Sequence, residues 1–194
     1  MNNITINSNS NDIKEMEKLF PRAPLKIIAM EGCKELGQKV NDYIVNFRQS
    51  SYREELKSPM YATYLQDNYL VDAHCPRFGS GEAKGVLNES VRGKDLFIMT
   101  DVCNYSLTYS VNGYVNHMSP DDHYQDLKRL ISAANGKEHR LNIIMPFLYE
   151  SRQHKRSSRE SLDCALALQE LVRMGVETSL LLMLMTHVYK MRSR

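Results

Sequence analysis

Leu25-Lys26-Ile27-Ile28-Ala29-Met30 is a short apolar run, and a segment with helical periodicity follows it. Apolar runs of this length that lack a period of two are typical of strands buried on both faces of a sheet. In the following segment apolar residues share one stripe of a 3.6-residue helix, opposite a charged face; they are Leu36, Val40, Tyr43, Ile44 and Phe47. The sequence therefore predicts a strand followed by an amphipathic helix.

Further strands and helices alternate along the rest of the chain. Apolar runs predict strands at 69–73, 96–99 and 141–145. Ser119-Pro120-Asp121-Asp122 predicts the start of a helix. Serine caps free backbone amides at a helix N-terminus, and proline at the first helical position sacrifices no hydrogen bond. The two aspartates lie at the positive end of the helix dipole. We expect this helix to run to about Ala134. The alternation predicts an α/β fold with a mainly parallel sheet flanked by helices.

One more helix is predicted near the end of the chain. Ser157 and Glu160 have the spacing of a capping box, and Gly175 is a terminator. Between them lies a broad apolar face of Leu162, Ala165, Leu166, Leu168, Leu171 and Val172.

Composition excludes several classes of protein. The 194 residues include 42% hydrophobic and 25% charged residues, with a net charge of +2, so neither a disordered chain nor a generally basic nucleic-acid-binding surface is indicated. Residues 180–185 form the most apolar stretch, far shorter than the roughly 20 residues that span a bilayer. The start of the chain lacks a secretory signal, and the four cysteines are widely spaced. We expect reduced cysteines and a cytoplasmic protein that crosses no membrane.

Two loops are candidates for ligand binding, because ligands of parallel sheets bind beyond the carboxyl ends of the strands. The loop from Arg152 to Arg159 carries four positive charges and His154 just before the last predicted helix, which suits a triphosphate. The alternative is a solvated surface loop. Nucleic-acid binding is a third interpretation, but the loop has no interleaved aromatic residues to stack on bases.

The other loop is Arg77-Phe78-Gly79-Ser80-Gly81-Glu82. It combines a planar ring, a flexible backbone and a carboxylate, which could enclose a purine and accept hydrogen bonds from it or from its ribose. A two-glycine turn with Phe78 packed into the core would explain the same residues.

A metal site could be built from His117, Asp121, Asp122 and His123, since imidazole and carboxylate are common ligands. The two aspartates are better explained as first-turn residues of a helix. We therefore predict no protein-held metal site here.

Together these segments resemble the amino-terminal domain of ribose-phosphate pyrophosphokinase, or phosphoribosyl pyrophosphate (PRPP) synthetase. The resemblance covers about residues 25–178. One segment is close to the family's sequence, namely Asn88-Glu89-Ser90-Val91-Arg92-Gly93-Lys94-Asp95. Residues 77–82 resemble its Arg-Phe-Ser-Asp-Gly-Glu, Ser119-Pro120 onward its Pro-Asn-Asp-Asn, and residues 152–156 its Arg-Gln-Asp-Arg-Lys. Gly79, Ser80 and His154 depart from that pattern, so the chain looks like a divergent branch whose nucleotide preference does not follow from the resemblance.

The resemblance implies a type I phosphoribosyltransferase-like domain from an enzyme that moves diphosphate from MgATP to ribose 5-phosphate. It implies that Phe78 packs on adenine and that Glu82, with Ser80, helps to hold the nucleotide, in a site of a neighbouring subunit of a homo-oligomer. Arg152 and Gln153 would reach ATP, with His154 beside them in place of the family's aspartate. Mg²⁺ is the implied cofactor and ATP a substrate.

The ends of the chain depart from the family. We expect a polar, flexible arm over residues 1–24, the domain over 25–178 and a non-family tail over 179–194. The tail is interpreted as a one-base frameshift, because Ser179 to Thr186 can be decoded as Ile-Ile-Thr-Phe-Asp-Ala-His-Asp, the expected family strand and motif. On this interpretation the chain holds no catalytic residue and no ribose 5-phosphate site, and is inactive alone. The alternative is a non-catalytic subunit that associates with a complete synthetase.

Overall fold

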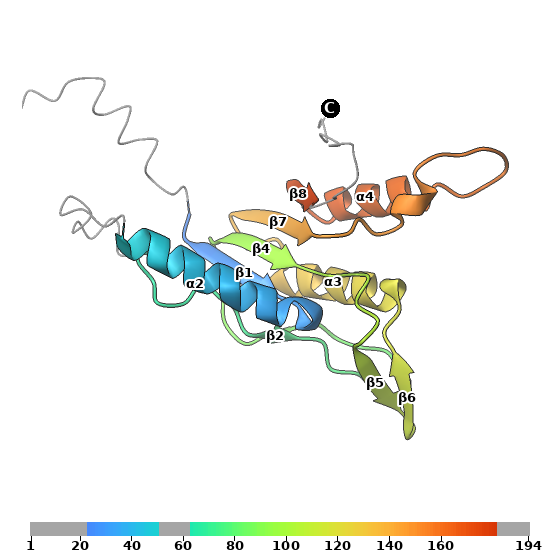
Figure 1. Ribbon diagram of the computed structural model, residues 1–194, viewed down its shortest axis with the longest axis horizontal. Coiled ribbons are helices and arrows are strands. Elements are labelled where there is room, and N and C mark those ends of the chain that lie inside the picture. Colours follow the sequence, from blue (N-terminus) through green and yellow to red (C-terminus); the bar gives the residue numbers. More distant parts are fainter. Residues whose placement is uncertain (1–22, 51–62, 182–194) are drawn as a thin grey trace, which may run out of the picture.

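A parallel four-stranded sheet forms the centre of the computed structural model, which describes residues 23–50 and 63–181. Its strands, in spatial order, are β1 (Leu25–Ala29), β4 (Asp95–Met99), β7 (Arg140–Met145) and β8 (Thr178–Leu181), all parallel to their neighbours (Figure 1). This confirms the predicted α/β class. Residues 1–22 of the predicted arm and 182–194 of the predicted tail lie outside the described residues.

Helices cover the two faces of this sheet. Helix α2 (Lys34–Ser50), preceded by the short η1 (Glu31–Cys33), packs on the face that carries Ile27 and Met99. Helices α3 (Pro120–Ala134) and α4 (Asp163–Arg173) pack on the opposite face (Figure 1). The core on that side includes Ile28, Leu96, Ile98, Leu141, Ile143 and Met145, none of which is more than 2% exposed. Alternate residues of each strand thus serve different layers, as expected for a sheet covered on both sides.

The face that helix α2 presents to the sheet overlaps only partly with the predicted apolar stripe. Leu36, Tyr43 and Phe47 are exposed, whereas Gly37 and Asn41 are buried. A Cβ on Gly37 would lie 2.4 Å from the Cβ of Ala29, so the helix approaches β1 at a residue without a side chain. The prediction of this helix is confirmed, and so are Val40 and Ile44 of its apolar stripe, which pack against the core; Leu36, Tyr43 and Phe47 of that stripe are not buried.

Helix α3 begins as predicted. The Ser119 hydroxyl accepts a hydrogen bond from the Asp122 amide, and the Asp122 carboxylate accepts one from the Ser119 amide, so the two residues form a capping box. The helix ends at Asn135, which has a positive φ of 59°.

Helix α4 begins differently from the prediction. Its first residue is Asp163, and Ser157 and Glu160 bond to each other inside the preceding loop instead of capping the helix. Gly175, with a φ of 96°, follows the helix as predicted.

Two antiparallel pairs complete the described structure. Strands β2 (Ala73–His74) and β3 (Val86–Leu87) form a short ribbon whose tip is residues 77–82. The predicted strand at 69–73 is found only as one parallel bridge between Leu70 and Ile27, in which the Ile27 amide donates to the Tyr69 carbonyl and the Val71 amide to the Ile27 carbonyl. The Tyr69 amide is bonded instead to the Asn41 side chain, and Ala73 belongs to β2.

The second pair is the hairpin of β5 (Thr108–Val111) and β6 (Tyr114–His117), which the sequence analysis did not predict. Asn112 and Gly113 join its strands with positive φ at both positions, as a two-residue hairpin turn requires. The hairpin projects from the body of the molecule (Figure 1). No helix within the described ranges is long and apolar enough to cross a bilayer.

Candidate functional site

The loop between β7 and α4 is anchored on the first turns of α3. The Tyr149 hydroxyl donates a 2.6 Å hydrogen bond to Asp121, and the Tyr149 ring stacks on Tyr124 with centroids 4.2 Å apart. Burial and the bond to Asp121 raise the pKa of Tyr149, so the phenol remains a donor at neutral pH. Glu150 then turns the chain with a positive φ of 56°. These contacts fix the position from which η4 (Ser151–Gln153) begins.

Arg152 lies on η4 near the loop that follows β4. Burial raises the pKa of the Cys103 thiol, Asp101 raises it further, and the charge of Arg152 opposes them. Arg152 and Cys103 are both exposed. The carboxyl ends of β4 and β7 therefore place a cation, a carboxylate and a thiol in one electrostatic neighbourhood, where ligands of parallel sheets bind.

Gln153 and His154 hold this loop in shape. The Gln153 side-chain amide donates a 2.8 Å bond to the Ser161 carbonyl, which closes the loop at its far end. The His154 Nδ1 lies 2.7 Å from the Ser151 carbonyl. Because a carbonyl only accepts, this nitrogen carries the proton, and Nε2 is left as the outward-facing group. Gln153 is thus engaged within the protein, which the sequence analysis did not foresee.

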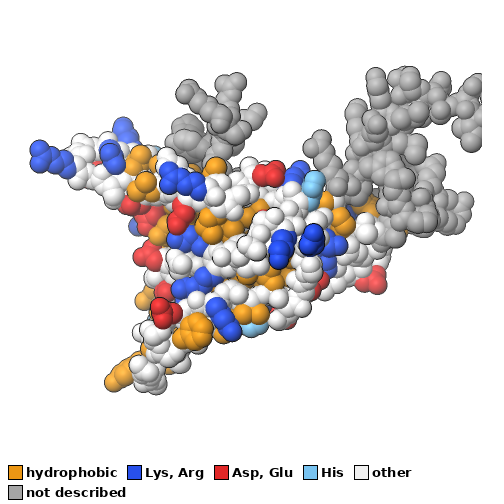
Figure 2. Space-filling model, turned by 180° about the vertical axis from the view of Figure 1, so that it is seen from behind, with side chains coloured by type: hydrophobic (Ala, Val, Ile, Leu, Met, Phe, Trp, Pro, Cys, Tyr) orange, Lys and Arg blue, Asp and Glu red, His pale blue; other side chains and the backbone are white. Residues whose placement is uncertain are grey.

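The cations of this loop are not neutralised by described carboxylates. Arg152, Lys155, Arg156 and Arg159 are exposed and form no ion pair with any described acid. Figure 2 shows Lys and Arg side chains gathered on this projecting loop. Unpaired cations beside a strand end favour an anionic ligand.

The second candidate loop forms the tip of the β2–β3 ribbon. The Phe78 amide donates to the Glu82 carbonyl at 2.7 Å, and the Gly81 amide donates to the Phe78 carbonyl at 2.9 Å. The Ser80 hydroxyl donates to the Glu82 carboxylate at 2.8 Å. Phe78 is 51% exposed, so the alternative in which it packs into the core is wrong. The turn presents a ring and an oriented carboxylate to solvent.

A buried ion pair that the sequence analysis missed holds this tip in place. Arg77 donates to Asp126 of α3 at 2.7 Å, and both side chains are at least nine-tenths buried. Arg77 also lies over the Tyr109 ring of β5, 4.7 Å from its centroid, and Arg129 bonds the other oxygen of Asp126. The Arg77–Asp126 pair spans 49 residues, and nothing in the local sequence pattern indicates it.

The structure does not bring the two candidate loops together within one chain. Among the described residues, no hydrogen bond or ion pair joins residues 77–82 to residues 151–160. Figure 1 places the ribbon and hairpin at one corner of the molecule and the loop before α4 at another.

Metal ligands are not gathered in the described part of the chain. No group of three or more His, Cys, Asp or Glu side chains there could hold an ion. Of the residues weighed as ligands, Asp122 bonds Ser119, Asp121 bonds Tyr149 and His123 lies 2.7 Å from the Asn104 carbonyl. The described residues do not fit a protein-held metal centre.

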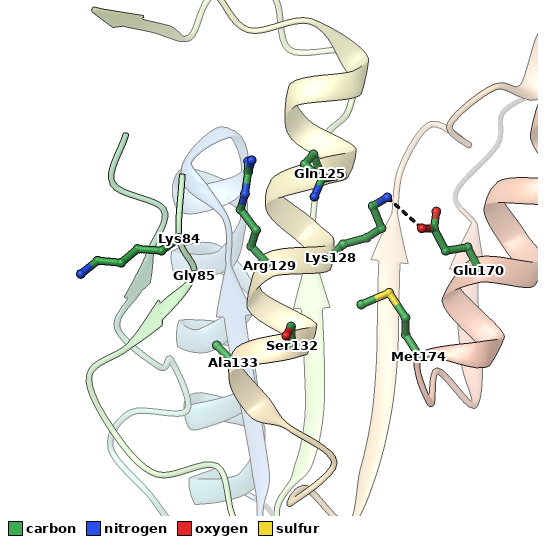
Figure 3. Close-up of a pocket in the computed structure, with 9 residues that line it drawn as sticks. All are labelled: Lys84, Gly85, Gln125, Lys128, Arg129, Ser132, Ala133, Glu170 and Met174. Atoms are coloured by element: carbon green, nitrogen blue, oxygen red, sulfur yellow. Dashed lines mark hydrogen bonds and ion pairs between the residues drawn. The ribbon is translucent and has the colours of Figure 1, made fainter. Parts of the chain in front are cut away.

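A groove of about 510 Å³ lies away from both loops, between α3, α4 and the chain before β3 (Figure 3). Two of its three lining cations are already paired: Lys128 bonds Glu170 at 2.9 Å, and Arg129 bonds Asp126. The third, Lys84, extends away from the other lining side chains (Figure 3). We assign no ligand to it.

Comparison with known proteins identifies one family. Residues 25–175 match the family model for the N-terminal domain of ribose phosphate pyrophosphokinase. The chain is 29% identical over 102 residues to ribose-phosphate pyrophosphokinase B of Dictyostelium discoideum. These 102 residues are 52% of this chain and 27% of that protein. Phosphoribosylpyrophosphate synthetase from Mycobacterium smegmatis has a similar fold, with a TM-score of 0.54 at 19% identity, over 81% of this chain and 41% of that one. The chain thus spans about a quarter of the curated relative and less than half of the solved one.

Proposed function

Because this chain belongs to the ribose-phosphate pyrophosphokinase family through its N-terminal domain, we propose that it binds the nucleotide substrate of diphosphate transfer, ATP with Mg²⁺. The observation that carries the proposal is the unpaired, cationic β7–α4 loop with Arg152 beside the end of β4. The family match supports the reaction class, and the loop supplies the chemistry for a polyphosphate.

Arg152 is the residue we assign to the phosphates. Its side chain is exposed, its charge acts on Cys103 of the loop after β4, and it has no carboxylate partner among the described residues. Gln153 serves the site by closing its loop through Ser161. His154 offers Nε2, which accepts a hydrogen bond when the ring is neutral and donates one when it is protonated. This differs from an aspartate, which only accepts.

The ribbon tip is assigned to the nucleoside. Phe78 offers a ring face for the purine, and Glu82 offers oxygens to ribose hydroxyls or a base amino group. The Ser80 hydroxyl, bonded to Glu82, fixes the direction of that carboxylate. Because the two loops lie apart in one chain, we propose that the tip of one copy completes the site of another.

The described residues provide groups for the nucleotide alone. We therefore propose that diphosphate transfer to ribose 5-phosphate requires residues beyond them, and that this chain has no turnover by itself. PRPP formation by the purified chain would contradict this part of the proposal. No feature of the described residues favours the alternative of a non-catalytic subunit.

Isothermal titration with MgATP tests the binding site. Loss of a charge-assisted bond to phosphate is worth about 1.5–3 kcal/mol, so Arg152→Ala should weaken binding by about 10–100-fold. Arg159→Ala, an exposed cation of the same loop, is the matched control and should change affinity by less than about threefold. Equal effects of the two substitutions would mean that the loop attracts anions only as a diffuse positive surface, without a specific role for Arg152. Absence of MgATP binding by the unmodified chain would refute the proposal.

A further inference from the structure

The β5–β6 hairpin is a projecting element with an unusual surface. The segment from residue 102 to residue 120 contains no Lys, Arg, Asp or Glu, although a quarter of the whole chain is charged. All of β6 is exposed, and Tyr114 and Val115 are 76% and 67% exposed. Natural edge strands that remain in water carry charges that block association. An uncharged, aromatic hairpin is instead typical of a surface covered by a partner.

This hairpin is firmly joined to the ribbon tip that carries Phe78. Arg77, next to Phe78, lies over Tyr109 of β5, and Val111 lies 3.6 Å from the place of a Cβ on Gly81. Val111 pairs directly with Tyr114 across the hairpin, so their side chains share one face. The hairpin face that carries Val111 and Tyr114 therefore adjoins the turn of residues 77–82, which also carries Phe78. Figure 2 shows hydrophobic side chains at the end of the projection.

We infer that the hairpin is a docking arm for a second copy of this chain, in which Tyr114 and Val115 contact the surface beside the partner's nucleotide loop. The inference rests on the proposed function, in which the ribbon tip completes a site in another copy. Since the hairpin and the tip are one unit, a surface that receives Phe78 also receives the hairpin. The absence of charge suits contact beside a cationic loop, because the hairpin brings no carboxylate to compete for Arg152 and no cation to repel it.

The stability of the hairpin gives independent support. A two-stranded hairpin alone in water is only marginally stable. At its base, the Met118 amide donates to the Leu107 carbonyl and the His117 ring stacks on Tyr105 with centroids 4.7 Å apart. Near its turn, Val111 lies against the ribbon tip on one side, while Tyr114 and Val115 remain exposed, and it is on these two residues that a partner would add contacts.

Sedimentation of the full chain over a range of concentrations tests the arm. Tyr114→Ser should weaken self-association at least tenfold, because buried aromatic residues dominate interface energies. Tyr43→Ser on α2 is the matched control, since Tyr43 is 71% exposed and belongs to another surface; it should leave association unchanged. A chain that stays monomeric, or equal association of the Tyr114 variant and the unmodified chain, overturns the inference.

Photocrosslinking locates the contact. A p-benzoylphenylalanine at position 114 should give a crosslinked dimer whose attachment point, mapped by mass spectrometry, lies within residues 99–105 or 146–160 of the second copy. Attachment elsewhere overturns the inference. If Arg152→Ala lowers MgATP affinity while Tyr114→Ser leaves association unchanged, the inference about the hairpin is refuted and the proposed nucleotide site is supported. If association depends on Tyr114 but MgATP does not bind, the interface stands and the proposed function fails.

Discussion

Cys103 is the exposed member of the four cysteines, and it neighbours Arg152 at the candidate nucleotide site. Burial and Asp101 raise the pKa of Cys33 to about 11, and burial and Asp126 raise the pKa of Cys75 to about 12. At pH 8 the thiolate fraction of Cys33 is therefore about one in a thousand, and that of Cys75 smaller. We expect iodoacetamide to modify Cys103 well before the other three in the folded chain, and faster as pH rises, since the thiolate is the reactive form.

Protection by nucleotide makes this alkylation a probe of the site. Bound phosphate beside Arg152 would cover Cys103 and add negative charge, which disfavours its thiolate. Peptide mass spectrometry should show alkylation of Cys103 slowed at least threefold by saturating MgATP, an effect of under about 1 kcal/mol. Inorganic sulfate at the same ionic strength is the control. Undiminished alkylation at saturating MgATP would separate Cys103 from the bound nucleotide.

The buried ion pair between Arg77 and Asp126 could not be predicted from the sequence. Arg77 belongs to a quoted motif, but its partner is 49 residues away and also serves Arg129. Helix capping, by contrast, depends on near neighbours, and Ser119 was predicted correctly for that reason. The candidate residues could be named from the sequence, whereas their division between two separate surfaces depends on long-range packing.

The chain before β3 packs closely against helix α3 at Gly85. A Cβ on Gly85 would lie 2.4 Å from the Arg129 carbonyl oxygen, so the chain before β3 rests directly on the backbone of α3. Because backbone cannot move aside cheaply, Gly85→Ala should lower the free energy of unfolding by about 1–3 kcal/mol or more. Gly79→Ala is the control, since nothing lies within 4 Å of its added Cβ. Urea denaturation compares the two, and equal stabilities would contradict the close approach.

Local signals explain which elements could be predicted. Strands β1, β4 and β7 each contain four apolar residues within a short segment, and their prediction needed no long-range information. The β5–β6 hairpin was missed although Asn112-Gly113 is a strong hairpin signal, because its strands are polar and pack on no core. The apolar stripe of α2 was only partly right: Val40 and Ile44 pack against the core, while other stripe residues are exposed because the helix approaches β1 most closely at Gly37. Apolar periodicity therefore identifies a helix more securely than it identifies the buried face.

Strand β8, which contains the last described residues, is the edge strand of the central sheet. It pairs with β7 from Asn142–Thr178 to Met145–Leu181. Residues 179–181 belong to the segment predicted to depart from the family, yet their backbone completes the sheet. Deleting residues 178–194 should cost about 2–4 kcal/mol of stability at about 1 kcal/mol per lost backbone bond, and should expose an edge prone to association. Light scattering and thermal unfolding measure both effects, and deletion of residues 186–194 is the control that retains β8.

Completion of the nucleotide site by two copies can be tested by mixing two defective chains. Phe78→Ala retains Arg152, and Arg152→Ala retains Phe78, so neither chain alone should form an intact site. In an equal, randomly exchanged mixture, a site combines an intact Arg152 with a partner's intact Phe78 about one time in four, whichever symmetry relates the copies. Titration with MgATP should therefore recover tight binding at about a quarter of all sites. If both loops served the site of their own chain, mixing would restore nothing, because every chain in the mixture carries one defect. The mixture thus separates a shared site from a self-contained one without requiring turnover.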